Sequence, residues 1–197
     1  MQLILASGSP RRRQLLEQIG LTFTVRASDA DERVVPGLSP AEVVEVLSAR
    51  KGEAVAAGAA PGDLILAADT VVSLDGAILG KPQDREEAVS MLTSLSGRTH
   101  QVYTGVTLIR DGVRRTEHEV TAVTFRSLSP EEIAAYVSTG EPMDKAGAYG
   151  IQGLGALLAE RLEGDYFNVM GLPLCRLGRM LSRFGVRPLE DAGALPE

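Results

Sequence analysis

The chain has 197 residues, of which 44% are hydrophobic and 23% charged, and its formal net charge is −6 at pH 7. This composition is typical of a globular protein with a substantial core and excludes a largely disordered chain. The acidic balance argues against broad binding of nucleic acid or an anionic membrane. The single cysteine, Cys175, excludes an intrachain disulfide. We expect a cytoplasmic protein without nucleic-acid or membrane partners, in which Cys175 is a small buried hydrophobe.

The first half of the chain alternates strand and helix patterns. A capping-box pattern with Pro after Ser39 marks the start of one helix, and a continuous apolar run predicts a strand buried on both faces. The predicted elements are a strand at 2–6, a helix at 10–18 closed by Gly20, a strand at 22–27, a helix from 40 to about 58, a strand at 64–74, an Asp-Gly hairpin turn at 75–76 and a strand at 77–79.

The second half begins with helical and strand patterns and then becomes rich in glycine. The predicted elements are a helix from 84 to 97, strands at 99–110 and 113–126 around a second Asp-Gly turn, a capped helix from 129 to about 140, a strand at 156–161 and a helix at 171–184. The whole predicts an α/β fold with parallel and antiparallel strand pairs. We expect residues 1–187 to form a single domain and residues 188–197 to be a disordered tail.

Three arginines, Arg11 to Arg13, occupy the first turn of the helix predicted at 10–18. Cations are unfavourable there, because a helix N-terminus already carries about half a positive charge and several unpaired N–H groups. A bound phosphate would compensate, since the guanidinium group matches phosphate oxygens and the small residues Ser7, Gly8 and Ser9 allow close approach of the backbone. The alternative is a solvated basic turn that contacts acidic side chains elsewhere. Adjacent helical residues lie about 100° apart, so we expect Arg13 to point away from the ligand.

Asp69 is the carboxylate most indicative of chemistry, because it interrupts the apolar run of a predicted buried strand. Such a residue is typically a metal ligand, a general base or a paired charge, although it could also simply close the strand. Lys81, between Gly80 and Pro82, does not form a P-loop, since the glycine spacing is too short and Pro replaces the Ser or Thr that binds magnesium. Lys81 is therefore a candidate phosphate ligand or an ordinary surface lysine.

Three further positions are candidates for the same site. Glu32 belongs to an acidic segment that supplies oxygen ligands for a divalent cation or is merely solvated. Lys51 lies in a predicted helix and faces either solvent or a cleft. Gln152 stands among glycines that allow the backbone to approach a ligand closely, and its amide can both donate and accept hydrogen bonds to a base.

Seven sequence blocks, ordered and spaced over about residues 3–175, together resemble the Maf family of nucleoside triphosphate pyrophosphatases. The blocks are Leu-Ala-Ser-Gly-Ser-Pro-Arg-Arg at 5–12, Ala-Asp-Thr-Val-Val at 68–72, Gly-Lys-Pro at 80–82, Leu-Ser-Gly-Arg-Thr-His at 95–100, Tyr-Thr-Gly-Val at 103–106, Glu-Pro-Met-Asp-Lys-Ala-Gly-Ala-Tyr-Gly-Ile-Gln-Gly at 141–153, and Gly-Asp-Tyr at 164–166 with Gly-Leu-Pro at 171–173.

The resemblance implies an elongated mixed β-sheet flanked by helices, with two lobes around a central cleft, as in inosine triphosphate pyrophosphatases. It implies hydrolysis of a nucleoside triphosphate to the monophosphate and pyrophosphate with Mg²⁺, Mn²⁺ or Co²⁺. It also implies a homodimer and a link to inhibition of septum formation. Within the family, the subgroup that acts on dTTP and UTP carries Arg, Thr and Gln where this chain has Arg11, Thr70 and Gln152. A second subgroup, which acts on 7-methyl-GTP, has Trp, Gln and Glu there.

Combined with the residues, the resemblance gives a mechanistic hypothesis. Asp69 is the expected catalytic base, and Glu32 and Asp69 are the expected metal ligands. The expected phosphate-binding residues are Ser7, Arg12, Lys51 and Lys81, with Arg11 also near the triphosphate. Two other classes remain open: a regulatory protein that binds nucleotide without turnover, and a phosphotransferase, which would need an acceptor site and would release no pyrophosphate. The acidic stretch around Glu32 is too variable for a firm alignment with the family.

Overall fold

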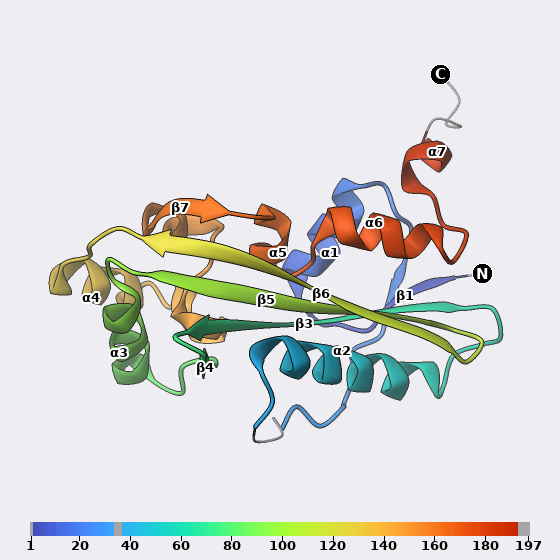
Figure 1. Ribbon diagram of the computed structural model, residues 1–197, viewed down its shortest axis with the longest axis horizontal. Helices are drawn as coiled ribbons and strands as arrows, with labels where there is room; N and C mark the ends of the chain where they lie inside the picture. Colours follow the sequence, from blue (N-terminus) through green and yellow to red (C-terminus); the bar gives the residue numbers. More distant parts are fainter. Residues whose placement is uncertain (1, 34–36, 193–197) are drawn as a thin grey trace. The chain divides into compact units, whose positions relative to one another are not determined.

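The computed structural model describes residues 2–33 and 37–192 (Figure 1). Within these residues the strands form one seven-stranded sheet in the order β2-β1-β3-β5-β6-β7, with β4 paired to β3. The strands are β1 (Leu3–Leu5), β2 (Thr24–Val25), β3 (Leu64–Leu74), β4 (Ala77–Leu79), β5 (Thr99–Arg110), β6 (Val113–Phe125) and β7 (Ala159–Glu163). Parallel pairs (β1 with β2 and β3) and antiparallel pairs (β3 with β4, β6 with β7) confirm the predicted mixed α/β fold.

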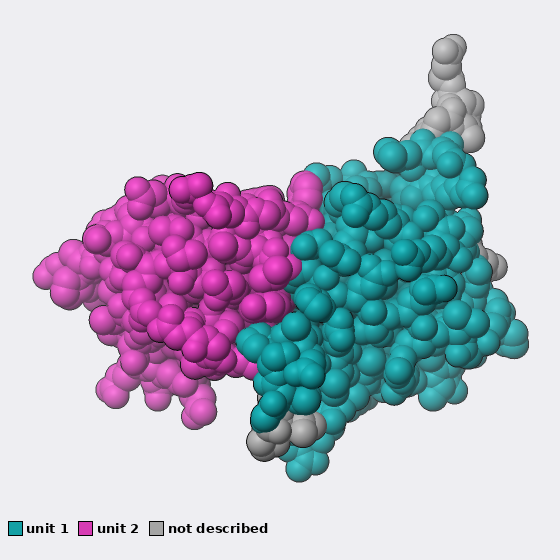
Figure 2. Space-filling view, viewed as in Figure 1, with its two compact units in different colours: residues 1–69, 104–119, 171–197 teal, residues 70–103, 120–170 magenta. Residues whose placement is uncertain are grey.

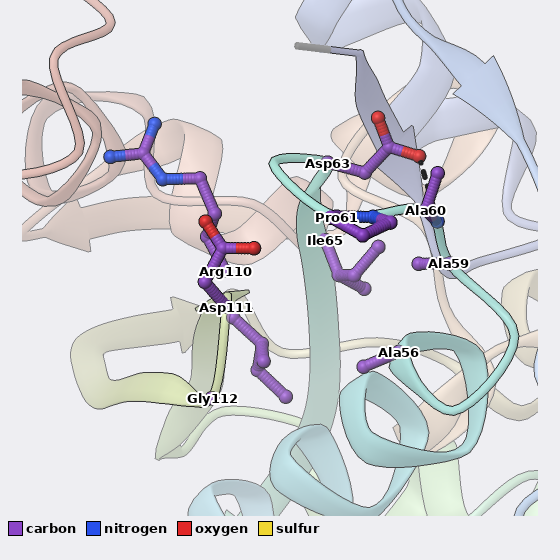
Figure 3. Close-up of a pocket in the computed structure, with 10 residues that line it drawn as sticks. Ala56, Ala59, Ala60, Pro61, Asp63, Ile65, Arg110, Asp111 and Gly112 are labelled. Atoms are coloured by element: carbon purple, nitrogen blue, oxygen red, sulfur yellow. Dashed lines mark hydrogen bonds between the residues drawn. The ribbon is translucent and has the colours of Figure 1, made fainter.

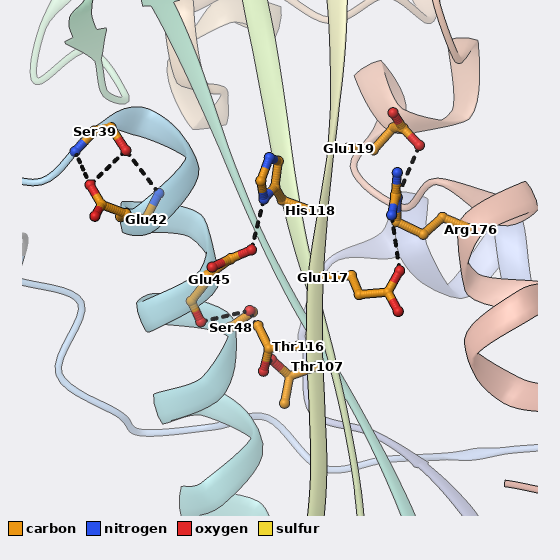
Figure 4. A network of polar contacts seen from close by, with 10 residues as sticks. All are labelled: Ser39, Glu42, Glu45, Ser48, Thr107, Thr116, Glu117, His118, Glu119 and Arg176. Carbon is orange, nitrogen blue, oxygen red and sulfur yellow. Dashed lines mark hydrogen bonds and ion pairs between the residues drawn. The ribbon is translucent and has the colours of Figure 1, made fainter. Parts of the chain in front are cut away.

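The helices include two that begin at their predicted caps, Ser39 and Ser129. The helices are α1 (Pro10–Gln18), α2 (Pro40–Ala56), α3 (Arg85–Leu95), α4 (Pro130–Ser138), α5 (Tyr166–Met170), α6 (Leu174–Ser182) and α7 (Pro188–Ala192), with 3-10 turns at Glu141–Asp144, Ala146–Ala148 and Gly153–Leu157. Ser39 and Ser129 each form a complete capping box with the glutamate three residues later. Figure 4 shows the first of these at the start of α2. None of the helices in the described residues is long and apolar enough to cross a membrane.

The chain divides into two compact units, coloured in Figure 2, through which the long strands β3, β5 and β6 pass. Unit 1 comprises residues 1–69, 104–119 and 171–197, and unit 2 comprises residues 70–103 and 120–170. In unit 1, β1 pairs with β2 on one side and β3 on the other, so the two right-handed crossovers run in opposite directions. The crossover helices α1 and α2 therefore lie on opposite faces of these strands (Figure 1).

Helix α2 packs closely on unit 1 of the sheet. Its apolar face joins side chains of β1, β3 and β5 in one buried cluster of Ile4, Ala6, Val55, Ile65, Ala67 and Ile109. The approach is tightest at Gly105 of β5, where an added Cβ would lie 2.2 Å from the Val44 carbonyl oxygen of α2. The Ser48 hydroxyl also lies 2.9 Å from the Thr107 hydroxyl of β5 (Figure 4). Glycine at position 105 thus sets the distance between helix and sheet.

Unit 2 has its own core, in which α3 and α4 pack together with the 3-10 turns that follow α4. A histidine, His100 of β5, is fully buried there against Phe125 and Tyr149, with ring centroids 5.0 and 5.4 Å away in edge-to-face arrangements. His100 Nε2 and the Tyr149 hydroxyl are 2.8 Å apart, whereas Nδ1 has no hydrogen-bond partner among the described residues. Burial lowers the pKa of His100 from 6.5 to about 4, which keeps the ring neutral at pH 7.

Three predicted element bounds need correction. The strand expected at 22–27 shortens to Thr24–Val25, and the strand expected at 156–161 begins only at Ala159. Residues 153–157 form a 3-10 turn instead, because Gly153 adopts a positive φ of 76° and the Leu158 N–H bonds back to the Gly155 carbonyl. The last predicted helix, at 171–184, shortens to α6 (Leu174–Ser182) with Pro173 as its N-cap, and α5 (Tyr166–Met170) just before it was not predicted.

Two predictions for the C-terminal part of the chain concern Cys175 and residues 188–197. Cys175 is exposed rather than buried. The buried face of α6 is formed by Leu177, Met180 and Leu181, and a residue two positions before Leu177 lies on the other side of the helix. In the predicted tail, α7 covers Pro188–Ala192, and residues 193–197 lie outside the described residues.

Replacing Gly105 by Ala is expected to reduce the free energy of unfolding by about 1–3 kcal/mol, the usual cost of overpacking a tight contact. Gly178 of α6 is the matched control, because an added Cβ there meets no atom within 4 Å and φ is not positive. Gly178→Ala should raise the stability by about 0.5–1 kcal/mol. Urea denaturation of both variants measures the difference, and a Gly105→Ala variant as stable as the unaltered protein would contradict the close approach.

The buried His100 also predicts a pH dependence of stability. Its pKa is lower in the folded state than in the unfolded chain, so the unfolded chain binds the proton more strongly. Stability is therefore lost as pH falls from about 6.5 to 4, by up to about 3 kcal/mol for a shift of this size. Urea denaturation from pH 7.5 to 4.5 should show this fall, and His100→Gln should flatten it more than the control His118→Gln. Equal pH profiles for the two variants would remove His100 from the effect.

Candidate active site

The predicted anion-binding turn opens α1, with Ser9 as N-cap and Pro10 as the first helical residue. The three arginines that follow are not equivalent. Arg12 is buried, and its Nε donates to the Gly171 carbonyl at 2.8 Å while Nη1 donates to the Ser7 hydroxyl at 3.0 Å. Arg11 is half-buried and Arg13 is exposed. The sequence offered no signal that Gly171, 159 residues away, would fix the orientation of Arg12.

Within unit 1, Arg12 interacts electrostatically with Asp69, the predicted catalytic carboxylate. Burial lowers the pKa of Arg12, and the negative charge of Asp69 acts in the opposite direction, with a smaller contribution from Glu32. Arg12 nevertheless stays positively charged, as arginine does in proteins. The structure therefore places a buried cation under the influence of Asp69, as the hypothesis of a phosphate-binding site near a catalytic base requires.

Lys51 of α2 is the centre of the charged cluster. Its Nζ lies 2.5 Å from Asp69 Oδ1 and 2.9 Å from Glu32 Oε1. The side chains of Lys51 and Asp69 are only 13% and 12% exposed, whereas that of Glu32 is 63% exposed. Of the two orientations considered for Lys51, the structure therefore shows the one in which its side chain contacts the predicted metal ligands and does not face solvent. Asp69 is likewise a paired charge in a buried strand and not a simple strand end.

Asp69 and Glu32 form a donor set that fits a small divalent cation. Both direct carboxylate oxygens at one ammonium nitrogen, so they converge on a single centre of positive charge. Among residues 2–33 and 37–192, no group of three or more His, Cys, Asp or Glu could hold a metal ion. Mg²⁺ commonly uses one or two carboxylates and takes its remaining ligands from water and substrate phosphates. Two carboxylates are therefore within the number of protein ligands that Mg²⁺ commonly uses.

The remaining predicted site residues, Thr70, Lys81 and Gln152, all belong to unit 2. Thr70 directly follows Asp69 in β3 and is the first residue of unit 2. Lys81 and Gln152 both belong to unit 2, where Lys81 is exposed and Gln152 is half-buried. The Gly147 N–H donates to the Gly80 carbonyl at 3.0 Å, so the lysine turn and the glycine-rich segment lie against each other. The structure thus brings Ser7, Arg12, Glu32, Lys51 and Asp69 together in unit 1.

A separate pocket of unit 1 does not contain these residues. It lies between the end of α2 and the β5–β6 turn, and its lining includes alanines, Pro61, Ile65 and Arg110 (Figure 3). Its two carboxylates are occupied by backbone groups: Asp63 accepts from the Gln2 and Ala60 N–H groups, and Asp111 accepts from the Gly62 N–H. We assign this pocket no role in the chemistry.

Two solved structures show a distant likeness to the chain. The Staphylococcus aureus Ham1 protein aligns with a TM-score of 0.46 and 16% identity, covering 64% of this chain and 72% of that one. A nucleoside-triphosphatase, dITP/XTP pyrophosphatase, of Mycobacterium abscessus aligns with a TM-score of 0.45 and 13% identity, covering 93% and 98%.

Sequence similarity is far stronger. The chain is 55% identical over 193 residues to a dTTP/UTP pyrophosphatase of Symbiobacterium thermophilum, with 98% of each chain covered. A dTTP/UTP pyrophosphatase of Moorella thermoacetica is 55% identical over 187 residues, which cover 94% of this chain and 96% of the relative. The family model described as Maf-like protein matches residues 2–184. The chain therefore belongs to the Maf family.

Proposed function

We propose that this protein hydrolyses nucleoside triphosphates, with dTTP and UTP preferred, to the monophosphate and pyrophosphate. The observation that carries the proposal is the convergence of Arg12, Lys51, Asp69 and Glu32 in one unit of a Maf-family chain. Buried cations beside carboxylates suit a substrate that is both highly anionic and activated for attack by water. The relatives named above carry the same activity in their names.

In this mechanism Arg12, with Ser7 beside it, binds phosphate oxygens, and Lys51 and Lys81 contribute further positive charge. Asp69 and Glu32 would hold the divalent cation, Mg²⁺, Mn²⁺ or Co²⁺, which when bound neutralises phosphate charge and acidifies water. Asp69 orients the attacking water and accepts its proton. The water oxygen bonds to the α-phosphorus, the bond from that phosphorus to the bridging oxygen breaks, and pyrophosphate leaves with the bonding electron pair.

Specificity for the base is assigned to Arg11, Thr70 and Gln152. Gln152 can pair with a pyrimidine edge because its amide offers both a donor and an acceptor. Arg11, on the half-buried side of the α1 turn, is the candidate that links base selection to phosphate binding. We further propose a cytoplasmic homodimer that acts on a free nucleotide and needs neither nucleic acid nor membrane, in keeping with the net charge of −6.

The direct test is a panel of nucleoside triphosphates incubated with purified protein and Mg²⁺, Mn²⁺ or Co²⁺. Stoichiometric monophosphate and pyrophosphate, formed fastest from dTTP and UTP, are expected. Nucleotide binding without turnover would instead indicate a regulatory protein. Nucleoside diphosphate with a phosphorylated acceptor would indicate a phosphotransferase.

Asp69→Asn should lower kcat on UTP by at least about 100-fold, because the amide cannot accept the proton from water. Binding of a non-hydrolysable UTP analogue, measured by calorimetry, should survive, since the cationic side chains remain. Asp63→Asn is the control, because Asp63 precedes the same strand and its carboxylate accepts from the Gln2 and Ala60 N–H groups, which lie outside the proposed site. An Asp69→Asn enzyme with nearly full activity would exclude Asp69 as the base.

Gln152→Glu should reduce the preference for UTP over CTP and GTP by at least about tenfold, equivalent to about 1.4 kcal/mol of discrimination. The carboxylate has no donor, so it cannot form both hydrogen bonds to the pyrimidine. The kcat/KM values for the three nucleotides measure the effect, and Gln18→Glu at the exposed end of α1 controls for added charge. Unchanged ratios would remove Gln152 from base selection.

A further inference from the structure

The segment that carries Gln152 is held by one carboxylate of unit 2, that of Glu141. Its Oε1 accepts from the Gly155 N–H at 3.0 Å and its Oε2 from the Leu154 N–H at 3.1 Å. Oε1 also accepts from the Tyr136 hydroxyl at 2.9 Å. All three partners are donors, so the site requires a group that only accepts. The ionised carboxylate meets that requirement and an amide does not.

Tyr136, which donates to Glu141, also holds the other end of the segment, at Gly150. It lies on α4 with 6% of its surface exposed, and its hydroxyl accepts from the Gly150 N–H at 3.2 Å. One hydroxyl–carboxylate pair therefore fixes residue 150 before Gln152 and residues 154 and 155 after it. The backbone of Gln152 is extended, with φ −91° and ψ 155°, between these two attachment points.

Gly153 and Gly155 lie so close to Glu141 and Tyr136 that neither position has room for a side chain. Gly153 adopts a φ of 76°, and an added Cβ there would lie 2.8 Å from Glu141 Oε2. A Cβ on Gly155 would lie 2.7 Å from the Tyr136 hydroxyl oxygen and 2.2 Å from the Gly150 carbonyl oxygen. The backbone thus lies directly on the two side chains, and only glycine allows this contact.

Glu141 is itself fixed at the start of the 3-10 turn Glu141–Asp144. Its N–H donates to the Thr139 hydroxyl at 3.1 Å, and its carbonyl accepts from Lys145 Nζ at 2.6 Å. Burial acts to raise the pKa of the Glu141 carboxyl, but the hydrogen bonds from Gly155, Leu154 and Tyr136 outweigh it and the pKa is lowered. The carboxylate is therefore ionised at neutral pH, in the state that its three donors need.

We propose that Glu141 is a positioning residue for base selection, whose carboxylate, together with the Tyr136 hydroxyl, holds residues 150–155 so that the Gln152 amide meets the base in one orientation. The inference rests on the proposed role of Gln152 in reading the base. Glu141 acts through the segment and needs no contact with the nucleotide.

Glu141→Gln is the first test, because it keeps the size of the side chain and replaces one acceptor by a donor. We expect the ratio of kcat/KM for UTP to that for CTP to fall at least about fivefold, mainly through a higher KM for UTP, with kcat for UTP within about twofold. Tyr136→Phe should lower the ratio in the same direction, and Glu141→Asp should restore part of it. The exposed Glu160 supplies the control variant Glu160→Gln.

A double-mutant cycle separates positioning from a general structural role. If Glu141 acts through Gln152, Glu141→Gln should change selectivity little in a Gln152→Ala background. Additive changes, or an equal loss of activity on every nucleotide with an unchanged ratio, would overturn the proposal. Thermal unfolding monitors the fold of each variant, and Tyr136→Phe carries the test should Glu141→Gln not fold. Unchanged selectivity in Gln152→Ala itself would refute the proposed function of Gln152, which is a distinct outcome.

Discussion

The ion pair between Lys51 and Asp69 is the interaction on which the site depends. Asp69 stands in β3, a strand that is buried along most of its length, and an unpaired carboxylate there would lose hydration without compensation. Lys51 reaches it from α2 at 2.5 Å, and removing one partner of a buried pair of this kind typically costs about 3–5 kcal/mol. The stability of the fold and the retention of a carboxylate in this strand are therefore coupled.

The surrounding architecture explains how this pair can be held so closely. Gly105 allows α2 to approach β5 without an intervening side chain. Val55 of α2 packs with Ala67 and Ile109 in the buried cluster between this helix and the sheet. On the other face of these strands, α1 presents Arg12 from a turn whose geometry is fixed by the Gly171 carbonyl. Charged groups on rigid elements keep their orientation without substrate, and such preorganised charge is what stabilises a phosphoryl transition state.

Much of this arrangement could be predicted from local patterns in the sequence. The capping boxes place α2 and α4, and the Asp-Gly turns place the two hairpins, because these signals act over a few residues. An Asp inside an apolar strand indicated a metal ligand, a general base or a paired charge for the same local reason, and the structure shows the pairing with Lys51. Long-range contacts left no such signal: Lys51 could equally have faced solvent, and the partner of Arg12 is a backbone carbonyl far along the chain.

The sequence predictions that proved wrong also failed because they depend on contacts between distant parts of the chain. The apolar residues 156–159 favour a strand, but hydrogen bonds from residues 154 and 155 to Glu141 hold the start of this region in a 3-10 turn. The exposure of Cys175 follows from which face of α6 is buried, and a leucine-rich sequence around the cysteine obscures that face. The chemical roles of the site residues depend on substrate as well as on fold, so all of them remain proposals.

In the proposed reaction, the charged cluster of Arg12, Lys51, Asp69 and Glu32 directs water to the α-phosphorus. Hydrolysis of UTP in ¹⁸O-labelled water, followed by mass spectrometry of the products, tests this step most directly. Attack at the α-phosphorus puts one ¹⁸O atom in the uridine monophosphate and none in the pyrophosphate. Label in the pyrophosphate would show attack at the β-phosphorus and would contradict the proposed reaction.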